Sequence, residues 1–545
     1  MKTIRICLGQ INPIVGDLEG NADKIIGFIK KAKELKADIV AFPELSLSGY
    51  PPEDLLLKPH FIAENKAKLL QIAETSKSIF SIIGFPYSDR NKLFNAAALI
   101  YNGKLLDVYK KIYLPNYGVF DEKRYFSPGD KCDVVTLDSN VKVGVNICED
   151  IWYPKGPQRI QVSAGGAKAI INISASPYHA RKIELREKML SKRARENNAF
   201  MLYCNLVGGQ DELVFDGGSL VFDNKGRLLA RGKQFEEDLI VADLNLSKDK
   251  KTLHFVNKIE KKLGFLDEIY AALKLGIKDY VGKNNFRKVV LGLSGGIDSA
   301  LVAVLAKDAL GSENVVALTM PSQYSSSVTR QDAKKIAGRL GIKLINVPIG
   351  GIYKSYLSLL KSYFKGCKPD IAEENIQARI RGNLLMGFSN KFGWLVLTTG
   401  NKSEISTGYC TLYGDMAGGF AVLKDVPKGL VYRLAEHRNK LEGKEIIPKS
   451  VLLRAPSAEL RKNQKDQDTL PPYPVLDKII DMYVEKDMSL EEIVKKGFNR
   501  ETADRVVSMI DKNEYKRRQA PPGIKITPKA FGKDRRIPIT NAFSK

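Results

Sequence analysis

The hexapeptide SGGIDS, which begins at Ser294, combines residue types that can bind phosphate. It lies between an apolar run typical of a buried strand and a stretch with helical spacing of apolar residues. Gly295 and Gly296 allow a tight turn, and the start of the following helix offers unpaired N–H groups that attract anions. Asp298 adds a carboxylate that could hold Mg²⁺, and Ser299 adds a second hydroxyl to that of Ser294. No GK[ST] sequence closes the loop, and an ordinary glycine-rich turn is the alternative, but the hydroxyls and the acid favour phosphate binding.

Polar residues recur further along the chain. Asn375, Arg379 and Asn383 are spaced i, i+4, i+8, which places them along one face of a predicted helix. Thr399 and Glu404 follow the predicted strand WLVLTT, and a parallel sheet binds its ligands at the carboxyl ends of its strands. A solvated stripe is the alternative for the helix, but ligand contact is favoured beside a phosphate loop.

Three segments of the first half of the chain also attract attention. Glu44 lies in AFPELSLSGYP, Lys111 in YKKIYLPNYGVFDE and Cys148 in VNICEDIWYP. Each segment ends a predicted strand or begins the loop after one. Taken singly, a surface Glu, a surface Lys and a buried Cys are commonplace. The four histidines of the chain lie in no recognisable nucleophile motif, so Cys–His and Ser–His–Asp chemistry have few candidates.

Two α/β regions must position these residues. Residues 1–245 contain buried strand candidates, two hairpins and helices, one of them capped by Asn21. Residues 246–262 are rich in lysine and are predicted to be a linker. From 263 to 545, repeated strand–helix–strand units predict a doubly wound parallel sheet. The tail from Lys512 is basic, contains several Pro and Gly residues, and is predicted to be irregular.

Composition limits the classes of protein that the chain can be. A length of 545 residues requires at least two domains, and 44% apolar with 27% charged residues excludes collagen-like, disulfide-scaffold and wholly disordered chains. No apolar run approaches the roughly 18 residues of a membrane span. The start MKTIRICLGQINPIVGD is predicted to be a strand and turn rather than a signal peptide. Six cysteines without a CxxC pair favour a reduced, cytoplasmic protein and argue against a thiolate metal site.

The chain is strongly basic, with 86 Lys and Arg against 62 Asp and Glu and a net charge of +24. Such a surplus suggests anionic partners, either nucleic acid or phosphorylated small molecules, although a lysine-rich surface explains it equally well.

The SGGIDS loop resembles the pyrophosphate loop of ATP pyrophosphatases. Five more segments, beginning at residues 374, 397, 414, 457 and 514, resemble NAD synthetases. This resemblance implies ATP contacts at Gly292, Leu293, Ser294, Gly295, Gly296, Ile297, Asp298, Ser299 and Thr399. It further implies contacts with deamido-NAD⁺ at Asn375, Glu404 and Lys516, and Mg²⁺ ligands at Asp298 and Glu404. A solvated charge run is the alternative for Lys516.

In their order and with their flanks, Glu44, Lys111 and Cys148 resemble the Glu–Lys–Cys triad of the nitrilase superfamily. The resemblance implies that Glu44 takes the thiol proton, that Cys148 attacks an amide carbonyl, and that Lys111 stabilises the oxyanion. The family spacing Tyr-x-Lys selects Lys111 over Lys110. The same resemblance implies a supporting glutamate and three contacts with glutamine: Glu122, Tyr117, Ser176 and Lys182. Arg181 is adjacent to Lys182 and remains an alternative to it.

Together the two resemblances predict a nitrilase-like αββα sandwich, residues 1–245, followed by a Rossmann-like ATP-pyrophosphatase domain, residues 263–545. This layout is similar to that of glutamine-dependent NAD⁺ synthetases, which use ATP, glutamine and deamido-NAD⁺. It implies a homo-oligomer, an ammonia tunnel, and no nucleic-acid or membrane partner. An amidotransferase acting on another substrate, such as a nucleotide base, is the enzymatic alternative. A nucleic-acid-binding protein is the alternative of another class, but no RRM, KH or helix-turn-helix signature supports it.

Overall fold

The computed structural model describes residues 3–137, 140–245 and 258–543. The chain forms two compact units, Met1–Glu268 and Ile269–Lys545. The boundary between them lies within helix α5 (Phe265–Lys283). Most of the predicted linker, residues 246–257, lies outside the described residues. The described end of this linker, residues 258–262, is joined to β13 of the first unit by a β-bridge between Ile259 and Arg231.

Unit 1 contains fourteen named strands and four α-helices among its described residues. The strands are β1 (Thr3–Gln10), β2 (Ile39–Ala41), β3 (Phe80–Asp89), β4 (Lys92–Tyr101), β5 (Lys104–Lys110), β6 (Val134–Thr136), β7 (Lys142–Ile147), β8 (Ala169–Ser174), β9 (Phe200–Asn205), β10 (Val207–Gln210), β11 (Leu213–Asp216), β12 (Leu220–Phe222), β13 (Leu228–Arg231) and β14 (Asp238–Asn245). The helices are α1 (Leu18–Glu34), α2 (Pro59–Thr75), α3 (Pro157–Ser163) and α4 (Lys182–Asn197), with short helical turns η1 (Glu53–Leu57), η2 (Glu122–Arg124) and η3 (Cys148–Ile151).

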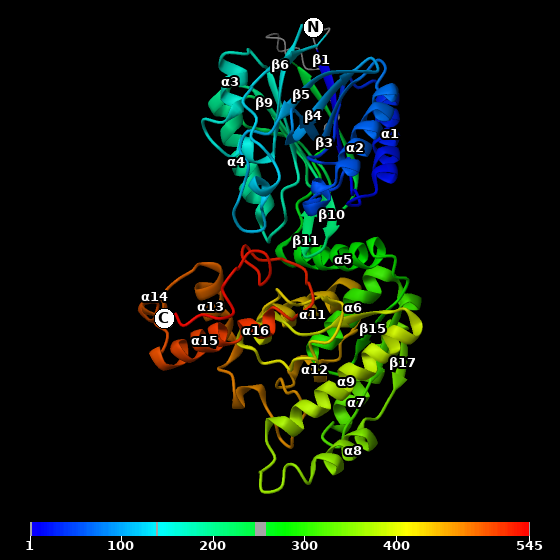
Figure 1. Cartoon of the computed structure of the whole chain (residues 1–545), viewed down its shortest axis with the longest axis vertical. Helices are drawn as coiled ribbons and strands as arrows, with labels where there is room; N and C mark the ends of the chain where they lie inside the picture. Colours follow the sequence, from blue (N-terminus) through cyan, green and yellow to red (C-terminus); the bar gives the residue numbers. More distant parts are fainter. Residues whose placement is uncertain (1–2, 138–139, 246–257, 544–545) are drawn as a thin grey trace. The chain divides into compact units, whose positions relative to one another are not determined.

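Two six-stranded sheets face each other in this unit. Their orders are β14-β1-β2-β3-β4-β5 and β13-β12-β9-β8-β7-β6, and β10 and β11 form a separate hairpin. Alternate residues of each sheet, such as Ile6 and Val145, share one core between the sheets. The outer face of the first sheet packs on α1 and α2, and that of the second packs on α4 (Figure 1). The expected αββα sandwich is therefore confirmed.

The cap of α1 differs from the prediction. Asp17 is the N-cap, and its carboxylate accepts from the N–H of Gly20 over 3.0 Å. Asn21 lies inside the helix, where its buried side chain bonds to the backbone of Ile14 and Leu47. An acid one turn earlier therefore starts the helix, and the asparagine holds the neighbouring loop.

Among its described residues, unit 2 is built on a sheet of five strands, all parallel, in the order β17-β16-β15-β18-β19. These are β15 (Val289–Gly292), β16 (Val315–Thr319), β17 (Lys343–Asn346), β18 (Leu395–Thr398) and β19 (Phe420–Ala421). The helices after α5 are α6 (Ile297–Leu310), α7 (Ser327–Leu340), α8 (Gly350–Leu360), α9 (Ile371–Phe392), α10 (Lys402–Thr407), α11 (Lys428–Glu442), α12 (Lys449–Leu453), α13 (Tyr473–Ile480), α14 (Leu490–Lys495), α15 (Arg500–Lys512) and α16 (Glu514–Arg517). Short turns are η4 (Ser312–Asn314), η5 (Asp466–Asp468) and η6 (Asp481–Glu485).

Both faces of this sheet are covered. Val290 and Val396 pack with residues of α8 and α9, while Leu291 and Leu397 point to the other face and are also buried. The strand order reverses between β15 and β18, and an open sheet of this kind binds its ligands at that switch point. The predicted doubly wound parallel sheet is confirmed, and it places the SGGIDS loop and the segment after β18 side by side.

Helices α13, α14 and α15 form a further apolar cluster beside the C-terminal segment (Figure 1). The tail is mostly irregular, as predicted, except for the short helix α16. It is packed rather than solvated, since Ile524 and Ile526 are buried and the Lys525 ammonium pairs with Asp534. None of the helices in the described ranges has the length and apolar character that a membrane span needs.

Candidate active sites

Glu44, Lys111 and Cys148 are brought together at the carboxyl ends of strands from both sheets. Glu44 comes after β2, and Lys111 directly follows β5 in the same sheet. Cys148 directly follows β7 of the opposite sheet and belongs to the core between the sheets. Three side chains that lie in separate segments of the sequence, the first and last of them 104 residues apart, therefore meet between the two layers.

The Lys111 ammonium is held between two carboxylates. Its Nζ donates to Glu44 Oε1 over 2.6 Å and to Glu122 Oε1 over 2.8 Å. The Lys111 and Glu44 side chains have no exposed surface. Burial lowers the pKa of Lys111, but the two carboxylates outweigh it and the pKa lies well above its usual value. Burial also raises the pKa of Glu122 to about 7, against the opposing charge of Lys111. Lys111 is therefore a fixed cation in this cluster.

Three neutral groups that sequence analysis missed complete the cluster. The Tyr50 hydroxyl donates to Glu122 Oε1 over 3.1 Å, and Asn95 Nδ2 donates to Glu44 Oε1 over 2.7 Å. The N–H of Ala175 donates to Glu44 Oε2 over 2.9 Å. Tyr50 stands in the same segment as Glu44, where it could have been suspected. Asn95 lies in the middle of β4, where no local pattern marks it.

Cys148 begins the turn η3 with a φ of +43°, a left-handed conformation that is uncommon for a residue with a side chain. Its thiol is buried, and burial followed by the charge of Glu44 raises the pKa well above the usual value for a thiol, while Lys111 opposes the shift. The raised pKa favours the protonated thiol, so Cys148 would need a nearby base to act as a nucleophile.

Glu149, the residue after Cys148, interacts with two of the predicted glutamine contacts, Tyr117 and Lys182. The Tyr117 hydroxyl donates to its two carboxylate oxygens over 3.0 and 3.1 Å. Burial raises the pKa of Glu149, and the positive charge of Lys182 acts in the opposite direction. A carboxylate and a phenol therefore lie next to Cys148, and the charge of Lys182 acts on that carboxylate. Sequence analysis quoted Glu149 only as part of the Cys148 segment.

The other residues near the start of α4 are placed differently. Ser176 is buried just after β8, and its N–H donates to Asn205 Oδ1 over 3.1 Å. The Arg181 guanidinium lies 5.1 Å from the centroid of the Phe265 ring, and its N–H donates to Glu268. Arg181 therefore faces α5. Burial raises the pKa of Glu149 against the charge of Lys111 and, more weakly, that of Lys182, whereas Arg181 is not among the causes of the shift.

In unit 2, the predicted phosphate loop is a tight turn between β15 and the N-terminus of α6. Gly295 has a φ of +86°, and a Cβ there would lie 2.1 Å from the carbonyl oxygen of Thr329, so only glycine fits. Ser294 Oγ accepts from the N–H of Gly296 over 3.2 Å and lies 3.1 Å from Ser299 Oγ. The loop thus presents hydroxyls and backbone N–H groups at a helix N-terminus, which suits an anion.

A cluster of charged side chains stands beside this loop. Lys428 Nζ donates to Asp298 Oδ2 over 2.5 Å and to Glu404 Oε1 over 3.1 Å, and Asn401 Nδ2 donates to Asp298 Oδ1 over 2.9 Å. Burial raises the pKa of Glu404 to about 7 despite Lys428, while the pKa of Lys428 itself is raised by the two acids against the effect of burial. The ammonium of Lys428 therefore occupies the space between the two carboxylates.

The pair of carboxylates suits a magnesium ion. The side chains of Asp298 and Glu404 are 18% and 17% exposed, so each keeps an open edge. In the parts of the chain that the structure describes, no group of three or more His, Cys, Asp or Glu side chains could hold a metal ion. Mg²⁺ commonly takes one or two carboxylates and completes its shell with water and phosphate oxygens. Two hard oxygen ligands beside a phosphate loop fit that requirement.

Two of the predicted dinucleotide contacts meet one segment, residues 408–411. Asn375 Oδ1 accepts from Thr411 Oγ1 over 2.7 Å. Lys516 Nζ donates to the carbonyl oxygens of Gly408 over 2.7 Å and Cys410 over 3.0 Å. The segment after α10 therefore links α9 to the C-terminal region.

The remaining predicted residues lie around the same end of the sheet. Thr399 directly follows β18 and is half-buried. Of the polar stripe on α9, Arg379 Nε donates to the carbonyl oxygen of Leu412 over 3.3 Å, while Asn383 is exposed. Lys428 and Asn401 were missed, although both stand in segments that resemble NAD synthetases. Only their common contact with Asp298 distinguishes them from their neighbours.

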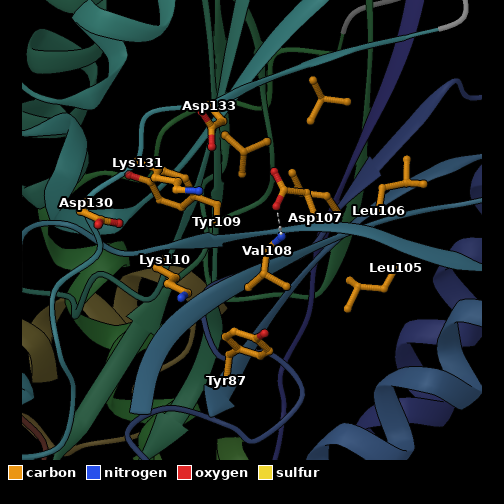
Figure 2. Close-up of a pocket in the computed structure, with 13 residues that line it drawn as sticks. Tyr87, Leu105, Leu106, Asp107, Val108, Tyr109, Lys110, Asp130, Lys131 and Asp133 are labelled. Carbon is orange, nitrogen blue, oxygen red and sulfur yellow. Dashed lines mark hydrogen bonds between the residues drawn. The ribbon is translucent and has the colours of Figure 1, made fainter. Parts of the chain in front are cut away.

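A pocket of about 330 Å³ lies elsewhere in unit 1, along the edge strand β5 (Figure 2). Figure 2 shows Tyr109 and Lys131 on its wall and Asp107, whose carboxylate accepts from the N–H of Val108 over 2.8 Å. None of the predicted catalytic residues lines this pocket.

Each of the two units matches a known protein family. The family model for NAD synthase matches residues 269–520, and that for carbon-nitrogen hydrolase matches residues 5–252. The glutamine-dependent NAD(+) synthetases of Thermotoga maritima and Aquifex aeolicus are each 50% identical to this chain. The first match covers 100% of this chain and 99% of the relative, and the second 99% and 100%.

Solved structures give the same result. The glutamine-dependent NAD⁺ synthetase of Acinetobacter baumannii in complex with ADP has a TM-score of 0.80 and 42% identity, covering 99% of this chain and 98% of that one. The corresponding protein of Cytophaga hutchinsonii, at 23% identity and a TM-score of 0.84, shares the fold. The resemblance inferred from the motifs is confirmed, and the chain belongs to the family of glutamine-dependent NAD(+) synthetases.

Proposed function

We propose that this chain is a carbon–nitrogen ligase that amidates deamido-NAD⁺ to NAD⁺, the final step of NAD biosynthesis. Deamido-NAD⁺, ATP, glutamine and water give NAD⁺, AMP, pyrophosphate and glutamate. The observation that carries the proposal is the presence of two chemically distinct sites in one chain. One is the buried cluster of Glu44, Lys111 and Cys148, and the other is the phosphate loop beside Asp298 and Glu404. Similarity to the two bacterial relatives over nearly the whole chain supports both.

In unit 1, the proposed reaction begins with a thiol that keeps its proton at rest. The raised pKa of the Cys148 thiol means that Glu44 takes its proton as the sulfur attacks the side-chain amide carbon of glutamine. Lys111 remains charged and stabilises the developing oxyanion. The proton on Glu44 then passes to the leaving nitrogen, ammonia departs, and a thioester remains. Glu44 then takes a proton from water, whose oxygen attacks the thioester carbon. The C–S bond breaks, glutamate is released, and Glu44 passes its proton to the Cys148 thiolate. Glu122 keeps Lys111 in place throughout.

The charged groups near Cys148 suit the zwitterionic end of glutamine. Lys182 would pair with its carboxylate, and Glu149 with its ammonium group. Tyr117 orients Glu149, and Ser176 lies buried at the end of β8 as a further polar contact.

In unit 2, residues Gly292–Ser299 and Thr399 would bind ATP, with the phosphates against the loop and the N-terminus of α6. The nicotinate carboxylate of deamido-NAD⁺ attacks the α-phosphorus, and pyrophosphate leaves. Ammonia then displaces AMP from the acyl-adenylate. Lys428 faces the phosphates as the buried cation of the site.

Asp298 and Glu404 would hold Mg²⁺, which neutralises charge on the phosphates when it is bound. Asn375, Glu404 and Lys516 would contact deamido-NAD⁺. The support for this assignment is that Asn375 and Lys516 meet the same segment after α10, the helix that carries Glu404.

Residues 1–245 would form the glutaminase domain and residues 263–545 the synthetase domain, with 246–262 as the linker. Ammonia produced in one must reach the other, which favours a tunnel, and we propose a homo-oligomer as its setting. The six cysteines are all free, which agrees with a cytoplasmic location.

The test is formation of NAD⁺ from deamido-NAD⁺, ATP and Mg²⁺, with glutamine or with ammonium as the nitrogen source. Product from both sources, with AMP and pyrophosphate in equal amounts, supports the proposal. If neither glutamine nor ammonium gives product, the proposal is contradicted. A screen of other carboxylate or carbonyl substrates for pyrophosphate release would then follow.

A further inference from the structure

Helix α10 carries two of the groups around the proposed metal site. Asn401 is its N-cap and donates to Asp298, and Glu404 lies in its first turn and accepts from Lys428. The side chain of Asn401 in turn accepts from the N–H of Glu404 over 3.1 Å. The position of this one helix therefore decides where Glu404 stands and where Asn401 meets Asp298, which belongs to α6.

The C-terminal end of α10 is capped by residues from far along the chain. Arg517 donates to the carbonyl oxygen of Ser406 over 2.6 Å, and Asn513 Nδ2 donates to that of Thr407 over 3.0 Å. Lys516 donates to the carbonyl oxygen of Gly408. The last carbonyl groups of a helix have no partner within the helix, so these contacts replace the missing ones.

The N-terminal end is held by Lys402, whose side chain has no exposed surface. Its Nζ lies 2.8 Å from Asp425 Oδ1 and 2.7 Å from Glu485 Oε1. It also donates to Thr527 Oγ1 over 2.8 Å and to the carbonyl oxygen of Lys529 over 3.3 Å. One buried ammonium group thus joins α10 to the end of η6 and to the C-terminal tail.

Asp425 completes the connection. It accepts from the N–H groups of Ile526 and Thr527, each over 2.7 Å, and from the Thr527 hydroxyl over 2.8 Å. Nearby, the N–H of Ala421 donates to the carbonyl oxygen of Pro522 over 2.8 Å. A buried cation that pairs with two carboxylates holds its partners firmly, because losing it leaves both carboxylates without a neutralising charge.

We propose that Lys402 is a positioning residue of the synthetase site, which fixes Asn401 and Glu404 by tying α10 to tail residues 521–529. The inference rests on the proposed function, in which Asp298 and Glu404 hold Mg²⁺ with the nucleotide. The buried lysine itself has no surface with which to touch substrate, so it acts through α10. The basic tail is in this account a structural part of the metal and nucleotide site.

The test measures binding of Mn²⁺, as a paramagnetic substitute for Mg²⁺, together with a non-hydrolysable ATP analogue to the full-length chain. In Lys402→Met, we expect at least a tenfold rise in the dissociation constant and a changed spectrum of the bound Mn²⁺. Glutamine hydrolysis in unit 1 should stay unchanged, and circular dichroism of the full-length chain serves as the check that unit 2, which contains Lys402, has folded. Lys529→Met is the matched control, because that side chain pairs with Asp487 near the surface and only its carbonyl oxygen contacts Lys402.

If Lys402→Met does not fold, Thr527→Val decides, since it removes only the hydroxyl shared by Lys402 and Asp425. Thr527→Val should raise the dissociation constant for Mn²⁺ and the nucleotide analogue several-fold, as Lys402→Met does. Binding equal to wild type in whichever of these two variants folds overturns the inference. Failure of the wild-type chain to bind Mn²⁺ and nucleotide would instead contradict the proposed function.

Discussion

Lys111 Nζ lies 2.6 Å from Glu44 Oε1, and neither side chain is exposed. Lys110, one residue earlier, points elsewhere: its ammonium pairs with Asp89 and lies 4.2 Å from the centroid of the Phe94 ring. Two adjacent lysines therefore have different environments, and only one of them can act on a carbonyl group beside Cys148.

This difference predicts that replacing each lysine with methionine has a large effect at position 111 and a small effect at position 110. Lys111→Met should reduce glutamine hydrolysis by about 10²–10³-fold, because a buried cation that stabilises an oxyanion is lost. Lys110→Met should keep most of the activity. The measurement is glutamate release by the two variants at saturating glutamine. A larger loss in Lys110→Met would mean that the wrong lysine has been assigned.

Lys182 and Arg181 form a second adjacent pair. Lys182→Met should raise KM for glutamine by about 10–100-fold, the effect of one lost charge-assisted hydrogen bond. Arg181→Met should change it little, since its guanidinium lies over Phe265. Synthesis from ammonium should be the same in both variants. The reverse order of KM values would place Arg181, not Lys182, at the glutamine carboxylate.

Lys428 stands between Asp298 and Glu404, where a cation would bind. Lys428→Met should therefore bind Mn²⁺ more tightly than wild type in the absence of nucleotide. Its NAD⁺ synthesis should fall by about 10²-fold or more from either nitrogen source, because the phosphates lose a cation. Titration of Mn²⁺ by electron paramagnetic resonance and assay of NAD⁺ check the two effects. Lys444→Met, at an exposed lysine, is the control. Weaker Mn²⁺ binding in Lys428→Met would show that the ammonium group does not compete with the metal ion.

Glu122 makes the stability of unit 1 depend on pH. Its pKa of about 7 in the folded state exceeds the ordinary glutamate value of about 4.3. Between these two values the folded chain binds more protons than the unfolded one, so stability falls as pH rises and levels off above about 7. Glu122→Gln removes this component, and its stability relative to wild type should rise across that window.

The measurement is denaturant unfolding followed by Trp152 fluorescence in a Trp394→Phe background, since the chain has two tryptophans. Glu237→Gln, which removes a half-exposed partner of Lys24, should follow the wild-type profile. Parallel pH profiles for Glu122→Gln and wild type would refute a raised pKa at this position.

The sequence was sufficient to predict features whose residues are contiguous in one segment. The tight turn at SGGIDS could be predicted because its glycines are contiguous between a strand and a helix. The binding of phosphate by its hydroxyls and acid stays a prediction. Asn95 and Lys428 could not be identified, since each acts through partners that only the folded chain brings near. Asn21 was misassigned as a cap because two polar residues, four positions apart, both suit the start of α1. Charge counting described the tail as basic but did not indicate that Lys525 is buried and paired.

The central claim is that one chain contains two separable chemistries, and Cys148→Ala tests it most directly. The measurement is NAD⁺ formation from deamido-NAD⁺ and ATP by this variant, with glutamine and with ammonium, beside Cys132→Ala as a control. We predict no detectable product from glutamine, synthesis from ammonium equal to wild type, and normal use of both sources by the control. Undiminished use of glutamine by Cys148→Ala would contradict the account, as would loss of synthesis from ammonium in a variant that folds normally.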